Sequence, residues 1–420
     1  MLFHIVRPGD TLFSVARTYG VPLRNLTFDN GILDPTRLPV GLCLIVREPT
    51  AVYTVRPGDT LFSIARATGT PLLTLWKNNL FLQGGAAIYP GDVLFLGTKG
   101  EHRSGFTIGG YVYPFTESGW LNTVLPPQNV IIPFTYGFRQ DGTLISPDDR
   151  KILNAASYYG IETFLHLSTL TENDTFSTAL AEDLLTSPAM QSALANSILK
   201  TLQSKRQSGV DVDFEYLGAR NASAYAAFLA FLKDFLAPYG YPVYAALAPK
   251  TRDDQPGLLY EGHDYAAVGS AVDAVLLMTY EWGYTYGPPQ AISPITPVTN
   301  VLKYALTRIP ADKILLGISD YGYDFTLPYV QGLSKARSLS IRDAVLLAGQ
   351  TGSVIRYDDT AAAPYFEYKE NGVSHIVWFE DPRSLSARLA LLPEYGLKGM
   401  LCWTYTRPDP ALLALLATLV

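Results

Sequence analysis

From about residue 106 onward, short apolar runs of this chain alternate with longer amphipathic or Ala-rich segments. Such runs are typical of strands buried on both faces, and the segments between them of helices covering a parallel sheet. The longest helical segment is 177–205. The strand-like runs number eight: 106–113, 130–136, 162–167, 210–215, 242–248, 274–280, 313–319 and 399–403. Eight β/α units predict an α/β fold of the (β/α)8 barrel type.

An open Rossmann-type sheet is the alternative architecture for the same alternation. It is disfavoured because no Gly-rich phosphate loop follows the first apolar run. The long interval between the seventh and eighth runs predicts a small α+β insertion at about 324–382, which would wall one side of a cleft above the barrel. Its expected elements are a helix at 340–352 and strands at 354–357, 365–369 and 374–379.

The first hundred residues contain a duplication. Nine consecutive residues, 6–14, recur without change at 55–63, and a repeat of this kind indicates two copies of one structural unit. The sequence of each copy predicts a short strand, a Pro-Gly-Asp turn, two helices and a closing strand. The candidate N-cap of the first helix is Thr11 in the first copy and Thr60 in the second. We expect one βααβ module at 1–48, a second at 51–98, and the large domain at 104–420.

Composition narrows the class of protein. A net charge of −6 over 420 residues argues against a dedicated nucleic-acid binder. The apolar runs are too short or too interrupted to span a bilayer. The chain opens without the basic, apolar and small-residue regions of an ordinary secretion signal. We expect a protein with no membrane span and no classical signal peptide.

The run Gly209–Tyr216 carries the candidate chemistry. Alternate residues of a strand share one face, so Asp211, Asp213 and Glu215 point one way and Val210, Val212 and Phe214 the other. The apolar face must pack against helices, so the carboxyls look into the barrel. Glu215 is nearest the C-terminal end of its strand, where (β/α)8 enzymes place catalysis.

Two alternative roles compete for this acidic face: a metal-binding cluster, and a buried network that only holds the barrel together. The five His residues stand alone in the sequence, at positions 4, 102, 166, 263 and 375, which disfavours a metal site. Burying three neighbouring carboxyls does not favour stability. We therefore expect a catalytic site with no metal and no cofactor.

This strand resembles the Asp-Gly-x-Asp-x-Asp-x-Glu signature of family 18 glycoside hydrolases, the chitinase-like enzymes. Ser208 stands where the first Asp of that pattern would be. Met278-Thr279-Tyr280 and Leu401-Cys402-Trp403 resemble two further motifs of the family. Three longer segments, 278–284, 321–324 and 377–381, look like its spore-associated branch, which cleaves spore-cortex peptidoglycan after N-acetylglucosamine.

The resemblance implies substrate-assisted retention, an exception to the usual two-carboxylate scheme of glycosidases. Glu215 would be the acid and then the base, and Asp213 would hold the sugar's acetamido group with help from Asp211. Tyr280 would orient the acetamido oxygen, and Trp403 would form an apolar floor beneath the sugar. The resemblance also offers a set of candidate subsite walls, for which core packing is the alternative role: Trp282, Tyr284 and Trp378.

The duplicated units resemble LysM modules, which bind glycans containing N-acetylglucosamine such as peptidoglycan or chitin. The resemblance implies grooves lined by the signature residues, namely Gly9, Asp10, Thr11 and Leu12 in the first copy and Gly58, Asp59, Thr60 and Leu61 in the second. For the Asp and Thr side chains, capping the following helix is an equally good interpretation.

The expected partner is therefore peptidoglycan or another N-acetylglucosamine polymer, bound by a monomer associated with the spore coat, the cortex or the cell wall. Two alternatives stay open: a chitinase, and a catalytically silent lectin on the same barrel. Retention of Glu215 and Asp213 favours an enzyme over a lectin.

Overall fold

The computed structural model describes residues 2–100, 105–171, 173 and 175–418; the predicted domain start at 104 lies outside them. Its centre is a closed barrel of eight parallel strands in which each strand pairs with the next along the chain and the last with the first. The barrel strands are β5 (Thr107–Val112), β6 (Val130–Pro133), β9 (Glu162–Ser168), β10 (Gly209–Asp213), β11 (Val243–Leu247), β12 (Ala274–Leu277), β13 (Ile314–Ser319) and β19 (Gly399–Trp403). The predicted (β/α)8 fold is confirmed.

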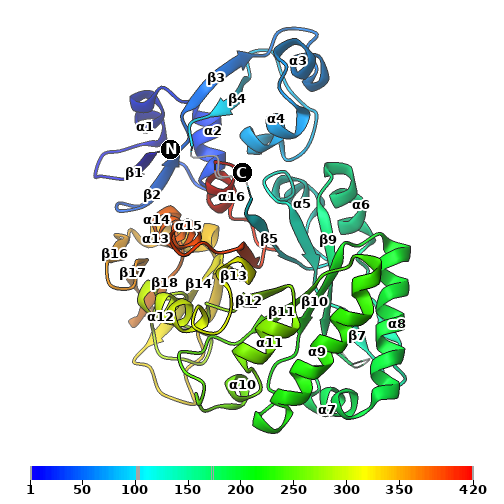
Figure 1. Ribbon diagram of the computed structural model, residues 1–420. Helices are drawn as coiled ribbons and strands as arrows, with labels where there is room; N and C mark the ends of the chain where they lie inside the picture. The colour runs from blue at the N-terminus through cyan, green and yellow to red at the C-terminus, as the bar shows by residue number, and fades with distance from the viewer. Residues whose placement is uncertain (1, 101–104, 172, 174, 419–420) are drawn as a thin grey trace.

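Helices surround this barrel in the lower half of Figure 1. The predicted helical segment 177–205 is two helices, because Ser187 ends the first and caps the second, which starts with Pro188 at a position that needs no N–H donor. The helices of the large domain outside its insertion are α5 (Ser118–Val124), α6 (Arg150–Tyr159), α7 (Thr178–Thr186), α8 (Pro188–Lys205), α9 (Ala222–Leu236), α10 (Leu258–Glu261), α11 (Tyr265–Ala271), α12 (Ile295–Ala305), α14 (Pro382–Leu389), α15 (Leu391–Tyr395) and α16 (Pro410–Leu416). A short hairpin follows β6, and its strands are β7 (Gly137–Phe138) and β8 (Leu144–Ile145), of two residues each.

The predicted insertion is present as a five-stranded antiparallel sheet with one helix. In spatial order its strands are β15 (Arg337–Ser340), β14 (Tyr321–Leu327), β18 (Val373–Trp378), β17 (Ala363–Glu370) and β16 (Arg356–Asp358), and its helix is α13 (Ile341–Thr351). The sequence pattern did not predict β14 and β15. β14 follows β13 with no turn signal between them, and β15 is a short polar edge strand with no apolar alternation.

Each LysM-like unit folds as predicted, with an antiparallel strand pair and two helices. The first unit contains β1 (Leu2–Ile5), α1 (Leu12–Tyr19), α2 (Leu23–Asp29) and β2 (Cys43–Val46), and the second contains β3 (Pro49–Thr54), α3 (Leu61–Thr68), α4 (Leu72–Asn78), a 3₁₀ turn η1 (Leu80–Leu82) and β4 (Val93–Thr98). Gly9 and Gly58 adopt φ of 89° and 86°, a left-handed conformation that the turn before each first helix requires.

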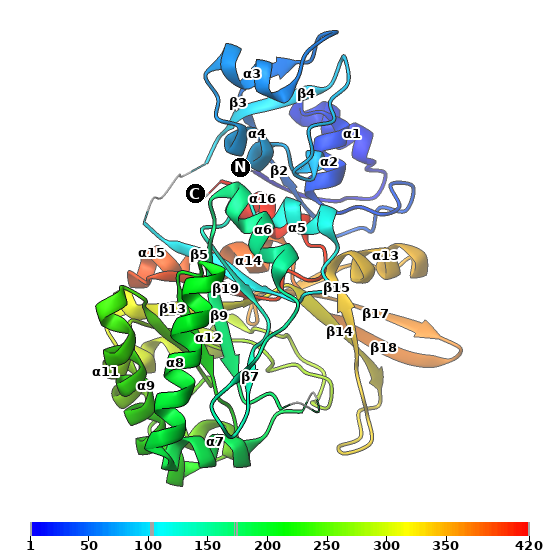
Figure 2. The same ribbon diagram turned by 90° about the vertical axis from the view of Figure 1, so that its right-hand side faces the viewer.

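The first module is packed onto the insertion. Its apolar side chains, among them Leu12, Leu26 and Leu44, form one hydrophobic cluster with Ala348 and Phe366 of the insertion. Figure 2 shows α2 above α13 and beside α16, the last helix of the chain. The module therefore belongs to the same packed body as the barrel.

The second module contacts the barrel through an aromatic pair. The ring centroids of Trp76 on α4 and Tyr159 on α6 lie 5.4 Å apart in an edge-to-face arrangement, and the Tyr159 hydroxyl donates to the Gly84 carbonyl at 3.2 Å. Arg47, buried at the end of β2, forms two hydrogen bonds with Asp29 and one with the Lys77 carbonyl of the second module. Side-chain contacts therefore fix both modules in place.

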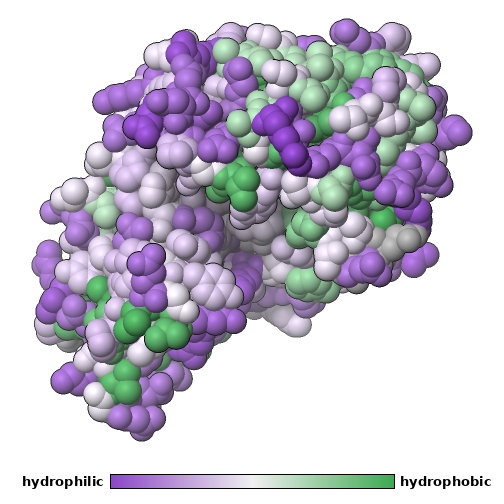
Figure 3. Space-filling view, turned by 90° about the horizontal axis from the view of Figure 1, so that it is seen from below, coloured by the Kyte–Doolittle hydropathy of each residue, from purple (hydrophilic) through white to green (hydrophobic). Residues whose placement is uncertain are grey.

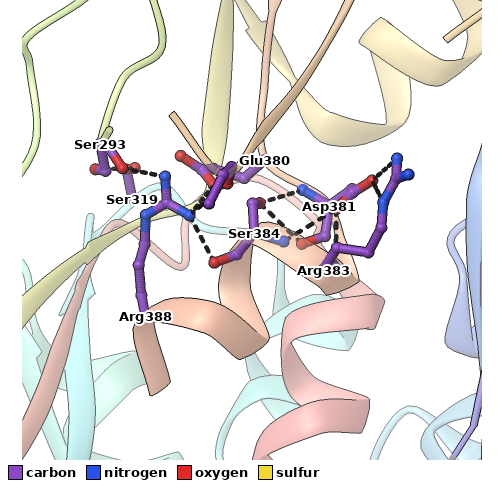
Figure 4. Close-up of polar contacts among 8 residues, drawn as sticks. Ser293, Ser319, Glu380, Asp381, Arg383, Ser384 and Arg388 are labelled. Atoms are coloured by element: carbon purple, nitrogen blue, oxygen red, sulfur yellow. Dashed lines mark hydrogen bonds and ion pairs between the residues drawn. The ribbon is translucent and has the colours of Figure 1, made fainter. Parts of the chain in front are cut away.

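A buried charged network ties the insertion to the barrel (Figure 4). Arg388 on α14 lies 3.4 Å from the Glu380 carboxylate and donates to the carbonyls of Ser384 and Ser293. Asp381 accepts N–H groups at the start of α14 and pairs with Arg383 at 2.6 Å. Removing one partner of a buried ion pair would leave the other charge buried and unpaired, which destabilises the fold. This network therefore holds β18 in place where it joins the barrel.

Candidate active site

The C-terminal ends of the barrel strands open into a cavity of about 390 Å³. Seen from below, the molecule is hollowed between two lobes on this side (Figure 3). Most of the lining residues lie at or just after the last residue of a barrel strand, the position that (β/α)8 enzymes use for catalysis. The lining consists of Tyr113, Phe134, Thr169, Phe176, Thr178, Asp213, Glu215, Tyr216, Met278, Tyr280, Glu281 and Trp403.

Glu215 is the carboxyl best placed for proton transfer. It follows the last residue of β10, Asp213, by two positions and lines the cavity with it. Burial, and next the negative charge of Asp213, raise the pKa of Glu215 to about 8. A carboxyl with that pKa carries its proton at neutral pH and can donate it.

Behind these two carboxyls lies a buried polar group from neighbouring strands. The Tyr111 hydroxyl on β5 donates to Asp211 Oδ2 at 2.8 Å. His166 on β9 places Nε2 3.8 Å from Asp211 Oδ2 and 3.6 Å from Asp213 Oδ2. Burial raises the pKa of Asp211 to about 6, and His166 and the Tyr111 hydrogen bond oppose that rise. No direct hydrogen bond between Asp211 and Asp213 is formed in the described structure.

His166 and Tyr111 are site residues that the sequence pattern did not predict. In the sequence, His166 is only an isolated histidine. A signal was present, because Phe164, His166 and Ser168 alternate along β9 and one face of each barrel strand looks inward. The parallel register that pairs His166 with Asp211 appears only in the folded barrel.

A second histidine, His263, bonds to the backbone just after the end of β10. His263 is fully buried, accepts the Ala248 N–H at Nδ1 and donates from Nε2 to the Phe214 carbonyl at 2.9 Å. Burial lowers its pKa, so the ring is neutral and donates from one nitrogen only. It therefore holds the backbone immediately before Glu215.

Tyr280 and Trp403 complete the cavity, as predicted from their motifs. Tyr280 is 9 % exposed, and burial raises its pKa well above the ordinary value, so its phenol keeps its proton. A Cβ on Gly317 would lie 2.8 Å from the Tyr280 ring and 2.4 Å from the Leu277 carbonyl, so a glycine on β13 makes room for this ring. Trp403 is the last residue of β19.

The three candidate subsite aromatics lie elsewhere. Trp282 packs against the main hydrophobic core, Trp378 on β18 stacks on Tyr365 with ring centroids 4.8 Å apart, and Tyr284 is 42 % exposed. None of them lines the cavity. Trp282 and Trp378 therefore make packing contacts, and their role as subsite walls stays a prediction. Glu281, which was not predicted, lines the cavity and accepts hydrogen bonds from Tyr321 and Tyr323 of β14.

In the LysM-like units, the signature side chains are engaged within each module. Thr11 and Thr60 accept the Ser14 and Ser63 N–H groups and form capping boxes. Asp10 accepts the Arg7 N–H at 2.7 Å, and Asp59 the Arg56 N–H at the same distance. Leu12 and Leu61 are only 2 % and 3 % exposed, so their side chains fill the module cores and do not line a surface groove.

The described residues contain neither a metal-binding cluster nor a membrane-spanning helix. Within them, no group of three or more His, Cys, Asp or Glu residues is placed to hold a metal ion. No helix among the same residues is long and apolar enough to cross a membrane.

The barrel has acidic residues and Trp403 at its C-terminal end and carries an α+β insertion, and comparison with known families identifies its class. The glycosyl hydrolases family 18 model matches residues 110–407, and the LysM domain model matches 4–47 and 53–97. The chain belongs to family 18 of the glycosyl hydrolases and carries two LysM domains, which confirms the family predicted from its motifs.

Particular relatives carry more specific names. The chain is 38% identical over 410 residues to a cortical fragment-lytic enzyme of Bacillus anthracis, covering 96% of this chain and 95% of that one. It is 41% identical over 271 residues to the cortical fragment-lytic enzyme of Bacillus subtilis strain 168, covering 64% of this chain and 63% of that enzyme. The crystal structure of the Bacillus cereus spore cortex-lytic enzyme SleL superposes with a TM-score of 0.82 at 36% identity, covering 100% and 98% of the two chains.

Proposed function

We propose that this chain is a retaining glycosidase that cleaves the β-1,4 bond after N-acetylglucosamine in spore-cortex peptidoglycan. The observation that supports it best is Glu215, a cavity-lining carboxyl whose pKa of about 8 keeps it protonated at neutral pH, with Asp213 lining the same cavity. The names of the full-length relatives, which refer to cortical fragments and to the spore cortex, support this polymer over chitin.

The first step breaks the glycosidic bond. The Glu215 carboxyl gives its proton to the glycosidic oxygen while the sugar's own acetamido carbonyl oxygen attacks the anomeric carbon. The electron pair of the broken bond leaves with the protonated oxygen, and an oxazolinium ring remains on the sugar. Asp213, which lines the same cavity, accepts the acetamido N–H and offsets the positive charge of that ring.

The second step opens the oxazolinium ring. The Glu215 carboxylate now takes a proton from a water molecule, whose oxygen adds to the anomeric carbon and restores the acetamido group. Two displacements at one carbon give net retention of configuration. Glu215 is protonated again at the end of the cycle.

Three other residues support these steps in the proposal. Tyr280, whose phenol stays protonated, donates a hydrogen bond to the acetamido oxygen and fixes its angle of attack. Asp211 acts through the buried group that it forms with Tyr111 and His166. Trp403, at the end of β19, provides an apolar surface beneath the sugar ring.

The domain division supports action on a polymer. We assign residues 1–48 and 51–98 to glycan-binding modules and 104–420 to the catalytic domain, which would act as a monomer on the spore cortex or wall. The expected glycan contacts of the modules are the exposed backbone around Gly9 and Gly58, because the signature side chains are occupied in caps and cores. Recovery of the protein with isolated spores, and not with vegetative cytosol, is the expected localisation.

The test is digestion of purified spore-cortex peptidoglycan and, in parallel, chitin oligomers by wild type and Glu215→Gln, with products identified by mass spectrometry. New reducing-end N-acetylglucosamine from cortex with wild type alone is the expected result. Cleavage of chitin alone would assign a chitinase, and binding without cleavage of either polymer would assign a lectin.

A further inference from the structure

Two further hollows continue the catalytic cavity across the molecule. A middle hollow of about 700 Å³ shares Tyr113, Glu281 and Trp403 with the cavity. A third hollow of about 820 Å³ shares Glu117 and Thr406 with the middle one. Because neighbouring hollows share wall residues, they follow one another along a path that begins at the cavity lined by Glu215. We call the third hollow the junction hollow.

The junction hollow lies where both modules meet the catalytic domain. Its walls include Phe28 of α2, Phe81 of η1, Trp120 of α5 and Arg342 of α13. In Figure 2, α2, α5 and α13 come together on the side facing the viewer, above the start of the inserted sheet. The path therefore runs from the active site to the underside of the first module.

Arg342 places a half-buried guanidinium in the wall of this hollow. Its Nε is buried without a hydrogen bond among the described residues. Its methylene carbons pack at Gly31 of the first module, where an added Cβ would lie 3.0 Å from them. By contrast, Arg24 in the same hollow is neutralised by Asp92 at 2.8 Å and lies over the Phe81 ring. The half-buried guanidinium of Arg342 lines the hollow without an ion pair to any described residue, and its terminal N–H groups favour an acceptor oxygen from a ligand.

The chemistry of the path suits a polysaccharide. Phe28 and Trp120 offer apolar faces that can lie against sugar rings. Glu117 is an ionised carboxylate whose two oxygens accept backbone N–H groups of α5, which lower its pKa. Burial raises the pKa of Asp320 in the middle hollow well above its ordinary value, so this carboxyl is neutral. Peptidoglycan carries both acetamido carbonyls and carboxylates, the acceptors that a guanidinium binds.

We propose that the junction hollow is a distal subsite for the strand being cleaved, in which Arg342 binds an acetamido or carboxylate oxygen of a sugar remote from Glu215. The proposal rests on the proposed function, since it takes the occupant to be the substrate polymer. Long strands then gain affinity that short fragments lack, and docking of the first module builds part of the substrate site.

The experiment measures binding by inactive protein, so that it does not depend on turnover. In a Glu215→Gln background, affinities for length-fractionated spore-cortex strands and for a cortex tetrasaccharide are compared before and after Arg342→Ala. The expected result is about a tenfold loss for long strands, the size of one charge-assisted hydrogen bond. Affinity for the tetrasaccharide stays unchanged.

Two further variants make the result interpretable. Arg356→Ala removes an exposed arginine of the same inserted sheet that lines none of the three hollows, and long-strand binding is expected to stay at the parent value. Thr27→Trp fills the junction hollow from α2 and leaves Arg342 itself in place, and the same length-dependent loss is expected. Melting temperatures verify that each variant is folded.

Unchanged long-strand affinity in both Arg342→Ala and Thr27→Trp overturns the proposal, and so does an equal loss for strands and tetrasaccharide. The proposed function fails separately, if active wild type leaves cortex uncut while strands still bind in a length-dependent way. Binding of neither length overturns both.

Discussion

His166 Nε2 lies 3.6 Å from Asp213 Oδ2, and its Nδ1 lies 2.7 Å from the Thr135 hydroxyl. The ring is 1 % exposed and bridges the side chains of three adjacent strand ends. It also lies 3.8 Å from Asp211. One imidazole is thus the common neighbour of Asp211 and Asp213.

Replacing this imidazole should change the acidic limb of the pH profile. His166→Gln removes the charge that lowers the pKa of Asp211, so that pKa rises above about 6. The acidic limb of kcat/KM is expected to move up by about one pH unit. Thr135→Val, which keeps the ring and removes its hydrogen bond, should move it less. A uniform loss of kcat at all pH values, with the limb unmoved, would mean that His166 is only structural.

The basic limb depends on Glu215. Since the acid must carry a proton to donate it, kcat/KM should fall as pH rises through about 8, the pKa of Glu215. Asp213→Asn removes one cause of the raised pKa, so the limb of the residual activity should move to lower pH. Turnover should also drop by about 10²–10³-fold through loss of charge stabilisation. Glu281→Gln, a change in the same cavity, should leave the limb in place. An unmoved limb in Asp213→Asn would contradict this coupling.

The raised pKa of Glu215 also has a cost in stability. Between its unfolded pKa near 4.5 and its folded pKa near 8, the folded protein holds a proton that the unfolded chain has released. The free energy of unfolding therefore decreases as pH rises through that window. Glu215→Gln removes the titration, so at pH 8 it should be more stable than wild type by about 1–3 kcal/mol and at pH 4 nearly equal. Urea denaturation at the two pH values measures the difference, and equal stabilities at pH 8 would contradict it.

Whether the Thr side chains of the LysM signature cap a helix or contact the glycan can be decided by measuring stability and glycan affinity separately. Thr60→Ala removes the N-cap of α3 and should lower the free energy of unfolding by about 1 kcal/mol, whereas Thr60→Ser should retain it. Glycan affinity of the folded protein should be equal in all three. A loss of affinity at unchanged stability would instead make the Thr60 hydroxyl a ligand contact.

The barrel could be predicted from sequence because parallel strands buried on both faces appear as continuous apolar runs, and each of the eight runs overlaps a barrel strand. The acidic face of β10 stood out because period-two alternation is a local property. β14 could not be separated from β13, since Asp320 between them is a single buried residue without a turn signal.

The parts of the site that the sequence did not predict depend on strand register. His166 and Tyr111 reach Asp211 only because β9 and β5 lie at particular offsets around the closed barrel. A motif gives residue types and not the direction of side chains, so it did not predict that the Leu12 side chain fills the module core. Trp378 was a candidate for a similar reason, and its stacking on Tyr365 became visible only in the inserted sheet.

The first module and the insertion share one hydrophobic core, although most of the chain separates them in sequence. Removing residues 1–48 would uncover Ala348 and Phe366 to water, and such a surface promotes aggregation. A truncated chain would therefore lose the support of its inserted sheet together with its first LysM module. The first module acts as a structural brace for the catalytic domain, and it cannot be exchanged as an independent tag.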